Sequence, residues 1–193
     1  MISAILLAAG ESKRLKGENK LVKTFKKKPL IHHSLKSLQK SKVKKIIIVL
    51  GFQSREVKKK IKKKKKIQFI LNEKFKLGIS TSIKVGLKKI YKKDRGFIIM
   101  QSDMPFVKTS DINKICNSIN KKKYLVHALK FKNRLGNPIG FDISVLEKFN
   151  KIKGNIGAKY MVKRLKNNTN FIKVHSGKVF KDFDLKKDFN KFE

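Results

Sequence analysis

The N-terminal stretch combines residue types that together can bind a phosphate group. An apolar run of strand length stops at small residues, and hydroxyl and cationic side chains follow at once. Small side chains let backbone N–H groups approach an anion closely, a hydroxyl adds a donor, and Arg or Lys brings fixed positive charge. The residues concerned are Ala8, Ala9, Gly10, Ser12, Arg14 and Lys20. The stretch predicts a phosphate-binding loop, although an ordinary glycine turn at the edge of a buried sheet explains the local pattern equally well.

Carboxylates are scarce in this chain, which makes the position of each one informative. Asp103 follows a predicted buried strand, and Asp182 and Asp184 alternate near the end of the sequence. Two carboxylates and the phosphates of a nucleotide form a natural Mg²⁺ site, because this hard cation prefers oxygen ligands. Each of the three also has a structural explanation as a turn former or helix cap, and for Asp103 taken alone that explanation is the stronger one.

Other catalytic arrangements are absent from the sequence. Gly10 and Gly17 stand too far apart for the G-x-x-x-x-G-K-[ST] loop, and no G-x-G-x-x-G occurs. There is no H-E-x-x-H, no Cys pair for zinc and no G-x-S-x-G elbow. The four histidines are spread along the chain, where surface or packing roles are expected: His32, His33, His127 and His175. A nucleotide site of another kind remains the favoured interpretation.

Apolar runs and helical spacings alternate through the first part of the chain and must position these residues. The predicted strands are 2–7, 46–50, 67–71 and 97–100. The predicted helices cover 29–41 and 56–66, a third follows N-cap candidates Ser80, Thr81 and Ser82, and a fourth begins at Thr109. This alternation predicts an α/β fold, a Rossmann-like three-layer αβα sandwich with a mainly parallel sheet. Residues that follow its strands should share one ligand-binding edge: Gly10, Gly51, Asn72 and Asp103.

The regular alternation stops after the fourth helix. Residues 124–131 and 137–142 read as two strands joined by 132–136, a small antiparallel excursion of the kind that often builds the acceptor side of a site. Further helices are predicted at 143–149 and 156–165, strands near 171–174 and 179–180, and a last helix from about Leu185. No linker could separate two domains, so we expect residues 1–193 to form a single domain.

The formal net charge of +38 comes from 51 basic and 13 acidic residues. Such a composition is typical of proteins that bind nucleic acid or an anionic membrane. However, only five basic residues are Arg, Trp is absent, and the lysines are scattered, whereas specific nucleic-acid readers use Arg and aromatic platforms. The run Lys62 to Lys66 is interpreted as the frayed, exposed end of a helix. We expect weak, salt-sensitive polyanion binding and no specific nucleic-acid partner.

The single cysteine and the apolar runs bear on the compartment. Cys116 cannot form an intramolecular disulfide, and its place on a predicted amphipathic helix favours a buried structural thiol. The apolar N-terminal run has no basic region before it, and no run reaches the length of a membrane span. We expect a cytoplasmic protein with no membrane partner.

Several motifs, taken in order, resemble those of the MobA-like nucleotidyltransferases. L-A-A-G-x-S-x-R is followed by E-N-K-L at 18–21, by L-N at 71–72, by G-I-S-T-S-I from Gly78 and by S-D-M-P around Asp103. G-N-P at 136–138 and G-N-I-G-A-K from Gly154 are similar to the G-N-P and G-D-x-G-A-R motifs of the molybdenum cofactor cytidylyltransferases. The resemblance covers nearly the whole chain.

The resemblance implies transfer of CMP from CTP to the phosphate of molybdopterin, with release of pyrophosphate. It also implies transient contact with a molybdoenzyme or its chaperone. By this analogy Arg14, Lys20 and Asp103 are catalytic, and Asp103 and Asp184 bind Mg²⁺. The acceptor-binding residues would be Asn137, Pro138 and Asn155. The nucleotide-binding residues would be Leu7, Ala8, Ala9, Gly10, Ser12, Arg14, Lys20, Asn72, Gly78, Ser80, Ser82 and Asp103.

The chain departs from the family pattern at three places. Lys16 stands where the family has glycine, Asn155 replaces an acidic residue, and Leu185-Lys186-Lys187 replaces T-P-E. The first change concerns the geometry of the phosphate loop, and the second removes a potential acceptor or metal contact. The third concerns only a local turn.

Two alternatives remain open at this point. The first is the same chemistry with another nucleotide or acceptor, as in a molybdenum cofactor guanylyltransferase or a sugar-phosphate nucleotidyltransferase. Within the family, L-A-A-G rather than L-A-G-G favours CTP over GTP. The second is a catalytically inactive, basic nucleic-acid-binding protein, against which the retained Gly10, Lys20 and Asp103 argue.

Overall fold

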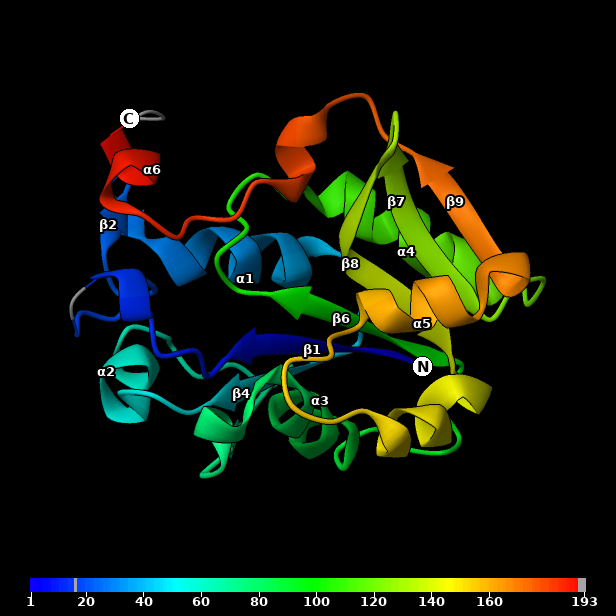
Figure 1. Ribbon diagram of the computed structural model, residues 1–193, viewed down its shortest axis with the longest axis horizontal. Helices are drawn as coiled ribbons and strands as arrows, with labels where there is room; N and C mark the ends of the chain where they lie inside the picture. Colours follow the sequence, from blue (N-terminus) through cyan, green and yellow to red (C-terminus); the bar gives the residue numbers. More distant parts are fainter. Residues whose placement is uncertain (16, 191–193) are drawn as a thin grey trace.

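The computed structural model describes residues 1–15 and 17–190, and their strands form one large sheet and one small sheet (Figure 1). The large sheet has seven strands in the order β5-β4-β1-β6-β8-β7-β9. The strands are β1 (Ile2–Ala8), β4 (Lys45–Leu50), β5 (Ile67–Leu71), β6 (Gly96–Gln101), β7 (Val126–Phe131), β8 (Arg134–Asp142) and β9 (Thr169–Lys173). Every residue of β1 is buried, as its largely apolar sequence predicts for a central strand covered on both faces.

The pairing of the strands is mainly parallel. β1 pairs in parallel with β4 and β6, β4 with β5, and β7 with β9, whereas β8 runs antiparallel to both β6 and β7. This is the predicted sheet with its antiparallel excursion, although the β7–β8 connection is shorter than expected. The carboxyl ends of β1, β4, β5 and β6 therefore lie along one edge, where the predicted site residues follow them.

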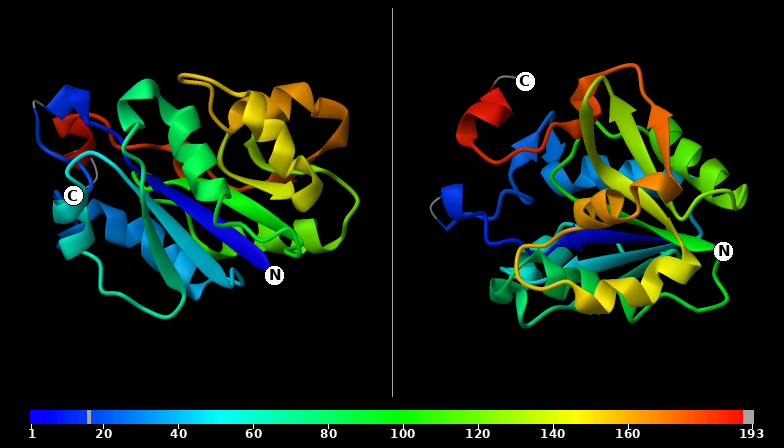
Figure 2. Two further views of the ribbon diagram at one scale, coloured as in Figure 1. Left: turned by 90° about the horizontal axis from the view of Figure 1, so that it is seen from below. Right: turned by 45° about the vertical axis from the view of Figure 1, so that its right-hand side comes forward.

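Helices cover both faces of the sheet, as the two views of Figure 2 show. One face carries α1 (Leu30–Lys40), α2 (Ser54–Lys59) and α4 (Thr109–Asn120), and the other carries α3 (Ile79–Leu87), α5 (Lys159–Arg164) and the 3₁₀ helix η3 (Ile143–Lys151). Alternate side chains of β1 enter the two cores: Ala4 and Leu6 pack toward α1, and Ile5 and Leu7 toward α3. The three-layer α/β fold is confirmed.

Short elements complete the description. They are the two-stranded sheet of β2 (Thr24–Phe25) and β3 (Lys28–Pro29), the helix α6 (Lys186–Asn190), and the 3₁₀ helices η1 (Lys13–Leu15), η2 (Phe75–Leu77), η4 (Lys166–Asn168) and η5 (Gly177–Phe180). The sequence does not predict the β2–β3 turn, because Lys26 and Lys27 adopt positive φ angles that lysine rarely takes.

Several local predictions are wrong, each for an identifiable reason. Residues 179–180 belong to η5, where Ser176 caps a tight turn, and not to a strand. The helix predicted over 56–66 ends at Lys59, since an uninterrupted lysine run offers no opposite charge to stabilise further turns. The helix predicted at 156–165 begins only at Lys159. The N-cap of α3 is Gly78, because the backbone N–H of Ser80 instead donates to the Gly154 carbonyl at 3.1 Å.

The structure shows the surroundings of the single cysteine and the lengths of the helices. Cys116 is fully buried in α4, and desolvation raises the pKa of its thiol to about 11, as expected for a structural cysteine. Among the described residues, no helix has both the length and the apolar composition that crossing a membrane requires.

Candidate functional site

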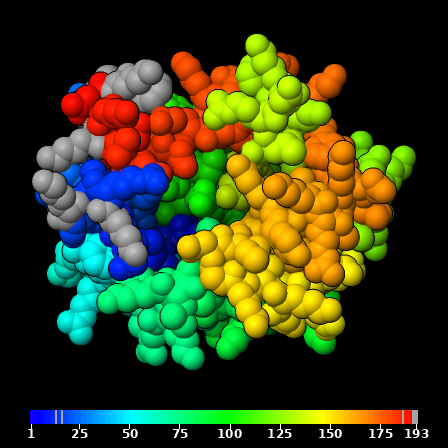
Figure 3. All heavy atoms as spheres, viewed as in Figure 1, coloured from blue at the N-terminus to red at the C-terminus, as the bar shows by residue number. Residues whose placement is uncertain are grey.

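A polar cavity of about 530 Å³ opens at the carboxyl edge of the sheet. Figure 3 shows this face hollowed between the blue N-terminal loop, the red C-terminal segment and the yellow segment before α5. The volume is within the range of small-molecule sites. The sequence-predicted site residues that line it are Leu7, Ala8, Ala9, Gly10, Ser12, Arg14, Lys20, Gly78, Ser82, Asp103, Asn155 and Asp184. The structure thus gathers residues from both ends of the chain around one cavity.

The loop after β1 is shaped by its own polar contacts. Ser12 adopts a positive φ of 53°, its carbonyl accepts the Leu15 N–H at 2.8 Å, and its hydroxyl accepts the backbone N–H of Lys20 at 3.1 Å. The Ser12 hydroxyl proton remains available for a ligand, since a hydroxyl can donate and accept at once. Small residues are required below the loop, because a Cβ on Gly51 would lie 2.7 Å from the Cβ of Ala9.

The far end of the loop is anchored by Asn19, which sequence reasoning passes over. Its Nδ2 donates to the Phe52 carbonyl at 3.1 Å, and its Oδ1 accepts the Leu21 N–H at 3.0 Å. Gln53 donates to the Gly17 carbonyl at 3.0 Å. Lys16, whose effect on this loop the sequence raises, lies outside the described residues. The buried amide of Asn19 fixes the backbone from which the neighbouring Lys20 extends.

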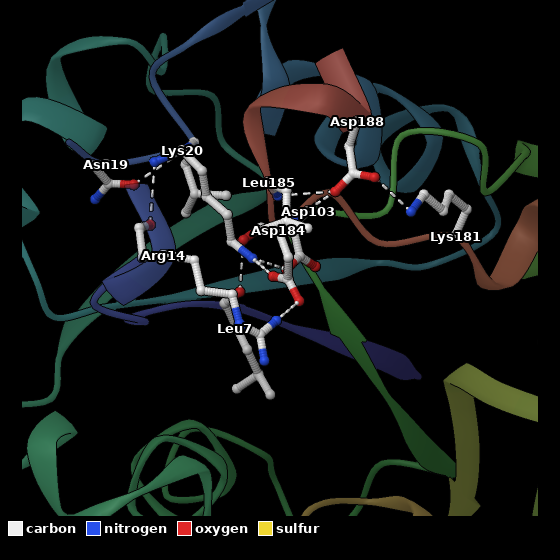
Figure 4. Close-up of polar contacts among 12 residues, drawn as sticks. Leu7, Arg14, Asn19, Lys20, Asp103, Lys181, Asp184, Leu185 and Asp188 are labelled. Atoms are coloured by element: carbon white, nitrogen blue, oxygen red, sulfur yellow. Dashed lines mark hydrogen bonds and ion pairs between the residues drawn. The ribbon is translucent and has the colours of Figure 1, made fainter. Parts of the chain in front are cut away.

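Lys20 joins two carboxylates that are far apart in the sequence (Figure 4). Its Nζ lies 2.5 Å from Asp103 Oδ2 and 2.6 Å from Asp184 Oδ1. Arg14 completes the cluster, with Nη1 2.8 Å from Asp184 Oδ2. Burial opposes protonation of Lys20, but the Asp103 carboxylate, supported by Asp184, outweighs that effect and raises the pKa of the ammonium. Burial raises the pKa of Asp103, and the ammonium partly offsets this rise.

The C-terminal segment reaches this cluster through backbone and aromatic contacts. The Phe183 N–H donates to the Asp103 carbonyl at 3.0 Å, and its ring packs against Phe25 with centroids 4.8 Å apart. Phe183 is fully buried. Burial of this ring sets Asp184, the next residue, beside the end of β6.

The carboxylate pair suits a hard divalent cation. Asp103 Oδ1 is buried and has no hydrogen-bond partner among the described residues, so one oxygen of this carboxylate is available to a ligand. Asp184 supplies the second carboxylate, and Asp182 also lines the cavity. No group of three or more His, Cys, Asp or Glu side chains in the described part of the chain forms a complete metal cage. Mg²⁺ is ordinarily held by one or two carboxylates together with waters and substrate phosphates, which fits this arrangement.

Two predicted nucleotide-binding residues lie behind the cavity and do not line it. Asn72 is buried; its Nδ2 donates to Thr81 Oγ1 and Ser82 Oγ at 2.9 Å each, and its Oδ1 accepts the Lys74 N–H at 3.1 Å. Ser80 is likewise buried in the first turn of α3. These contacts make Asn72 the link between the loop after β5 and the first turn of α3, from which Ser82 reaches the cavity.

Of the three predicted acceptor-binding residues, one lines the cavity and two do not. Asn155 lines the cavity beside Gly78, whose φ of +106° and close contact with the Gly154 carbonyl leave no room for a side chain. Asn137 and Pro138 do not line the cavity. They lie within β8, at the register shift of its pairing with β7 and just beyond its pairing with β6, and Asn137 Oδ1 is buried without a hydrogen-bond partner among the described residues.

Sequence reasoning misses other residues that line the cavity: Glu11, Leu21, Phe75, Lys76, Ile79, Gln101 and Ser102. Gln101 and Ser102 stand directly before Asp103 at the end of a predicted strand, so the rule that ligands bind at strand carboxyl ends could have found them. The Ser102 hydroxyl donates to the Leu7 carbonyl at 2.7 Å and thereby ties the ends of β6 and β1 together.

Comparison with known proteins identifies relatives of this arrangement. The model of the MobA-like NTP transferase domain family matches residues 4–169. The bifunctional protein GlmU of Clostridioides difficile (strain 630) is 27% identical over 146 residues, which are 75% of this chain and 30% of GlmU. The 2-C-methyl-D-erythritol 4-phosphate cytidylyltransferase of Lachnoclostridium phytofermentans is 30% identical over 141 residues, 68% of this chain and 58% of that protein. The chain therefore spans less than two thirds of the length of these relatives.

Solved structures show the same fold over almost the whole chain. Rv0371c from Mycobacterium tuberculosis H37Rv superimposes with a TM-score of 0.86 at 19% identity, covering 98% of this chain and 96% of that one. The Rv0371c complex with manganese has a TM-score of 0.81 at 16% identity, covering 99% and 97%. A CMP:2-keto-3-deoxy-manno-octonic acid synthetase complexed with CTP has a TM-score of 0.75 at 12% identity, covering 98% and 95%.

Proposed function

Because the chain belongs to the MobA-like NTP transferase family, we propose that it transfers CMP from CTP to the phosphate of molybdopterin and releases pyrophosphate. The observation that carries the proposal is the contact of Lys20 with Asp103 and Asp184 at the mouth of a loop suited to phosphate. Cationic groups that would contact a triphosphate thus lie beside carboxylates that would hold a metal. Residues 1–193 would act as one catalytic unit in the cytoplasm, in transient contact with a molybdoenzyme or its chaperone.

The loop and its cations would bind the nucleotide. Backbone N–H groups around Gly10 and the Ser12 hydroxyl would contact phosphate oxygens, while Arg14 and Lys20 would neutralise the negative charge that grows on the departing pyrophosphate. Asp103 and Asp184 would hold Mg²⁺, which when bound supplies charge neutralisation on the phosphates. The manganese complex of a protein with this fold and the unpartnered Asp103 Oδ1 both support a divalent cation here.

Attack by the acceptor phosphate needs orientation more than proton transfer. A phosphate oxygen of the acceptor forms a bond to the α-phosphorus of CTP, and the bond from that phosphorus to the bridging oxygen of pyrophosphate breaks. The attacking oxygen is already anionic, so no dedicated general base is required. Asn155 would orient the acceptor at the cavity, which Asn137 and Pro138 do not line. Positioning of the two reactants then supplies much of the rate enhancement.

The test is an assay of pyrophosphate release with molybdopterin and each of CTP, GTP, UTP and ATP, with Mg²⁺ present. We expect turnover with CTP, its loss in Asp103→Ala, and wild-type turnover in Glu147→Gln, which changes an exposed carboxylate remote from the cavity. Turnover of Asp103→Ala near the wild-type rate would remove Asp103 from the metal site. Absence of turnover with every nucleotide, together with tight RNA binding at physiological salt, would favour the nucleic-acid-binding alternative.

A second acceptor is favoured by a specific comparison. The relative from Lachnoclostridium phytofermentans is a cytidylyltransferase for a polyol phosphate, 2-C-methyl-D-erythritol 4-phosphate. The same assay can be run with this acceptor in place of molybdopterin, because both proposed reactions would release pyrophosphate from CTP. The rates with the two acceptors then separate the two possibilities. Faster turnover with the polyol phosphate would replace molybdopterin as the proposed acceptor and leave the nucleotidyl transfer unchanged.

A further inference from the structure

We propose that the Lys20 ammonium substitutes for the metal ion while no nucleotide is bound, so that metal and nucleotide enter the site together. The inference rests on the nucleotidyl transfer proposed above and concerns how the same site is loaded. It assigns Lys20 a second task besides contact with the triphosphate, namely to hold the carboxylate pair together and to exclude a divalent cation until the substrate arrives.

The geometry of the contact carries the first step. A single nitrogen, Lys20 Nζ, lies 2.5 Å from Asp103 Oδ2 and 2.6 Å from Asp184 Oδ1, and Figure 4 shows it between the two carboxylates. A divalent cation held by these two carboxylates would have to compete with the ammonium for them. The Lys20 side chain is only 13% exposed, so water cannot easily substitute for its carboxylate contacts.

The charges give the second step. Both carboxylates are already paired with cations: Lys20 contacts Asp103 and Asp184, and Arg14 lies 2.8 Å from the other oxygen of Asp184, while Asp182 lines the same cavity. A divalent cation added to this cluster would meet two positive groups that already contact its carboxylates, within a chain of net charge +38. Like charges at such distances repel strongly where solvent is partly excluded. Metal binding to the nucleotide-free protein is therefore weak while Lys20 remains in place.

The triphosphate gives the third step, because it supplies new partners for the ammonium. The loop backbone at Lys20 is held by the Ser12 hydroxyl and by the neighbouring Asn19, so only the flexible side chain has to move. When the ammonium turns to a phosphate oxygen, the carboxylates become available to the metal that accompanies the nucleotide. Asp103 Oδ1 is buried and has no hydrogen-bond partner among the described residues even while Lys20 contacts Oδ2, so this oxygen could also bind the metal. Metal and nucleotide then bind with positive cooperativity.

The experiment is a titration of Mn²⁺ into the nucleotide-free protein, with free Mn²⁺ measured by electron paramagnetic resonance. The variants are Lys20→Met, which keeps the length of the side chain and removes its charge, and Lys23→Met, which removes a nearby charge paired with Glu18. We expect Lys20→Met to bind Mn²⁺ at least about tenfold more tightly than wild type, because a unit charge at contact distance is removed. Lys23→Met should bind Mn²⁺ as wild type does.

Two further measurements complete the test. Adding a non-hydrolysable CTP analogue should tighten Mn²⁺ binding to wild type more than to Lys20→Met, since the variant has no ammonium to displace. Lys20→Gln serves if Lys20→Met does not fold, as judged by circular dichroism. Equal or weaker Mn²⁺ binding by the Lys20 variant that folds, relative to wild type, would overturn the proposal. This readout requires no turnover, so a failure of the proposed reaction in the pyrophosphate assay is recognised separately.

Discussion

Asp188 Oδ2 accepts the backbone N–H of Asp184 at 2.9 Å. The same oxygen accepts the Leu185 N–H at 2.8 Å, and Oδ1 accepts from Lys181 Nζ at 2.7 Å (Figure 4). Burial alone would raise the pKa of Asp188, but the Lys181 ammonium and the two N–H donors lower it to about 2. Asp188 is therefore a positioning residue that fixes the backbone carrying Asp184, in the turn where the family's T-P-E is replaced.

Replacing Asp188 by Asn should weaken the site without touching a substrate. We expect the rate of nucleotidyl transfer and the affinity for Mn²⁺ in the presence of nucleotide to fall about tenfold to a hundredfold, as when groups that orient metal ligands are changed. Asp142→Asn is the matched control, because Asp142 also accepts a backbone N–H, that of Ser144, but far from the cavity. Wild-type Mn²⁺ affinity in Asp188→Asn would show that Asp184 is positioned without this contact.

Gly78→Ala should damage both the stability and the nucleotide site. A Cβ at Gly78 would lie 2.4 Å from the carbonyl carbon and oxygen of Gly154, and φ is +106°. The strain should lower the free energy of unfolding by about 1–3 kcal/mol and raise the KM for the nucleotide. Gly157→Ala is the control, since its Cβ would meet only Ile79 methyl groups at an ordinary 3.7 Å. Urea unfolding and nucleotide titration measure the two effects, and equal stability of the two variants would contradict the expectation.

Lys66 differs from the exposed lysines that precede it. Its Nζ donates to the carbonyls of Leu38, Gln39 and Ser41 at 3.5, 3.2 and 3.1 Å, where α1 ends. A cation at a helix C-terminus is stabilising, so Lys66→Met should lower the free energy of unfolding by about 1 kcal/mol. Lys65→Met, at an exposed neighbouring position, should leave it unchanged. If thermal unfolding shows the same midpoint for both variants, the carbonyl contacts contribute nothing measurable.

The parts of the fold that follow from local pattern could be predicted from the sequence. The apolar runs of β1, β4 and β6 predict buried parallel strands, and the rule that ligands bind at their carboxyl ends places Gly10 and Asp103 at one edge. Tertiary contacts decided the rest. Lys66 looks like its neighbours in sequence, yet it alone of the run 62–66 is partly buried, because the end of α1 lies beside it.

The site itself was predictable by residue type more than by role. Sequence motifs bring Lys20, Asp103 and Asp184 into one hypothesis, but no spacing rule shows that the ammonium lies between the two carboxylates. Asn72 illustrates the converse case. As a polar residue after a strand it is a natural ligand candidate, and its amide is instead used by Thr81, Ser82 and Lys74 to shape the loop.

His127 predicts a specific loss of stability in mild acid. It is fully buried, with Nδ1 2.7 Å from the Ser118 hydroxyl oxygen, and that oxygen accepts from Asn170 Nδ2 at 2.7 Å. Burial lowers its pKa from 6.5 to about 4, although Asp142 and the Tyr124 backbone partly offset this effect. Between these two values the unfolded chain binds a proton at His127 that the folded protein does not bind. The contribution of neutral His127 to the free energy of unfolding is therefore complete above pH 6.5 and is lost as the pH falls toward 4. Each pKa unit corresponds to about 1.4 kcal/mol, so the loss amounts to about 3 kcal/mol.

Urea unfolding between pH 6.5 and 4 measures this loss. The free energy of unfolding should fall more steeply with pH for wild type and for the exposed-site control His175→Gln than for His127→Gln. Identical slopes in all three proteins would exclude His127 as the source.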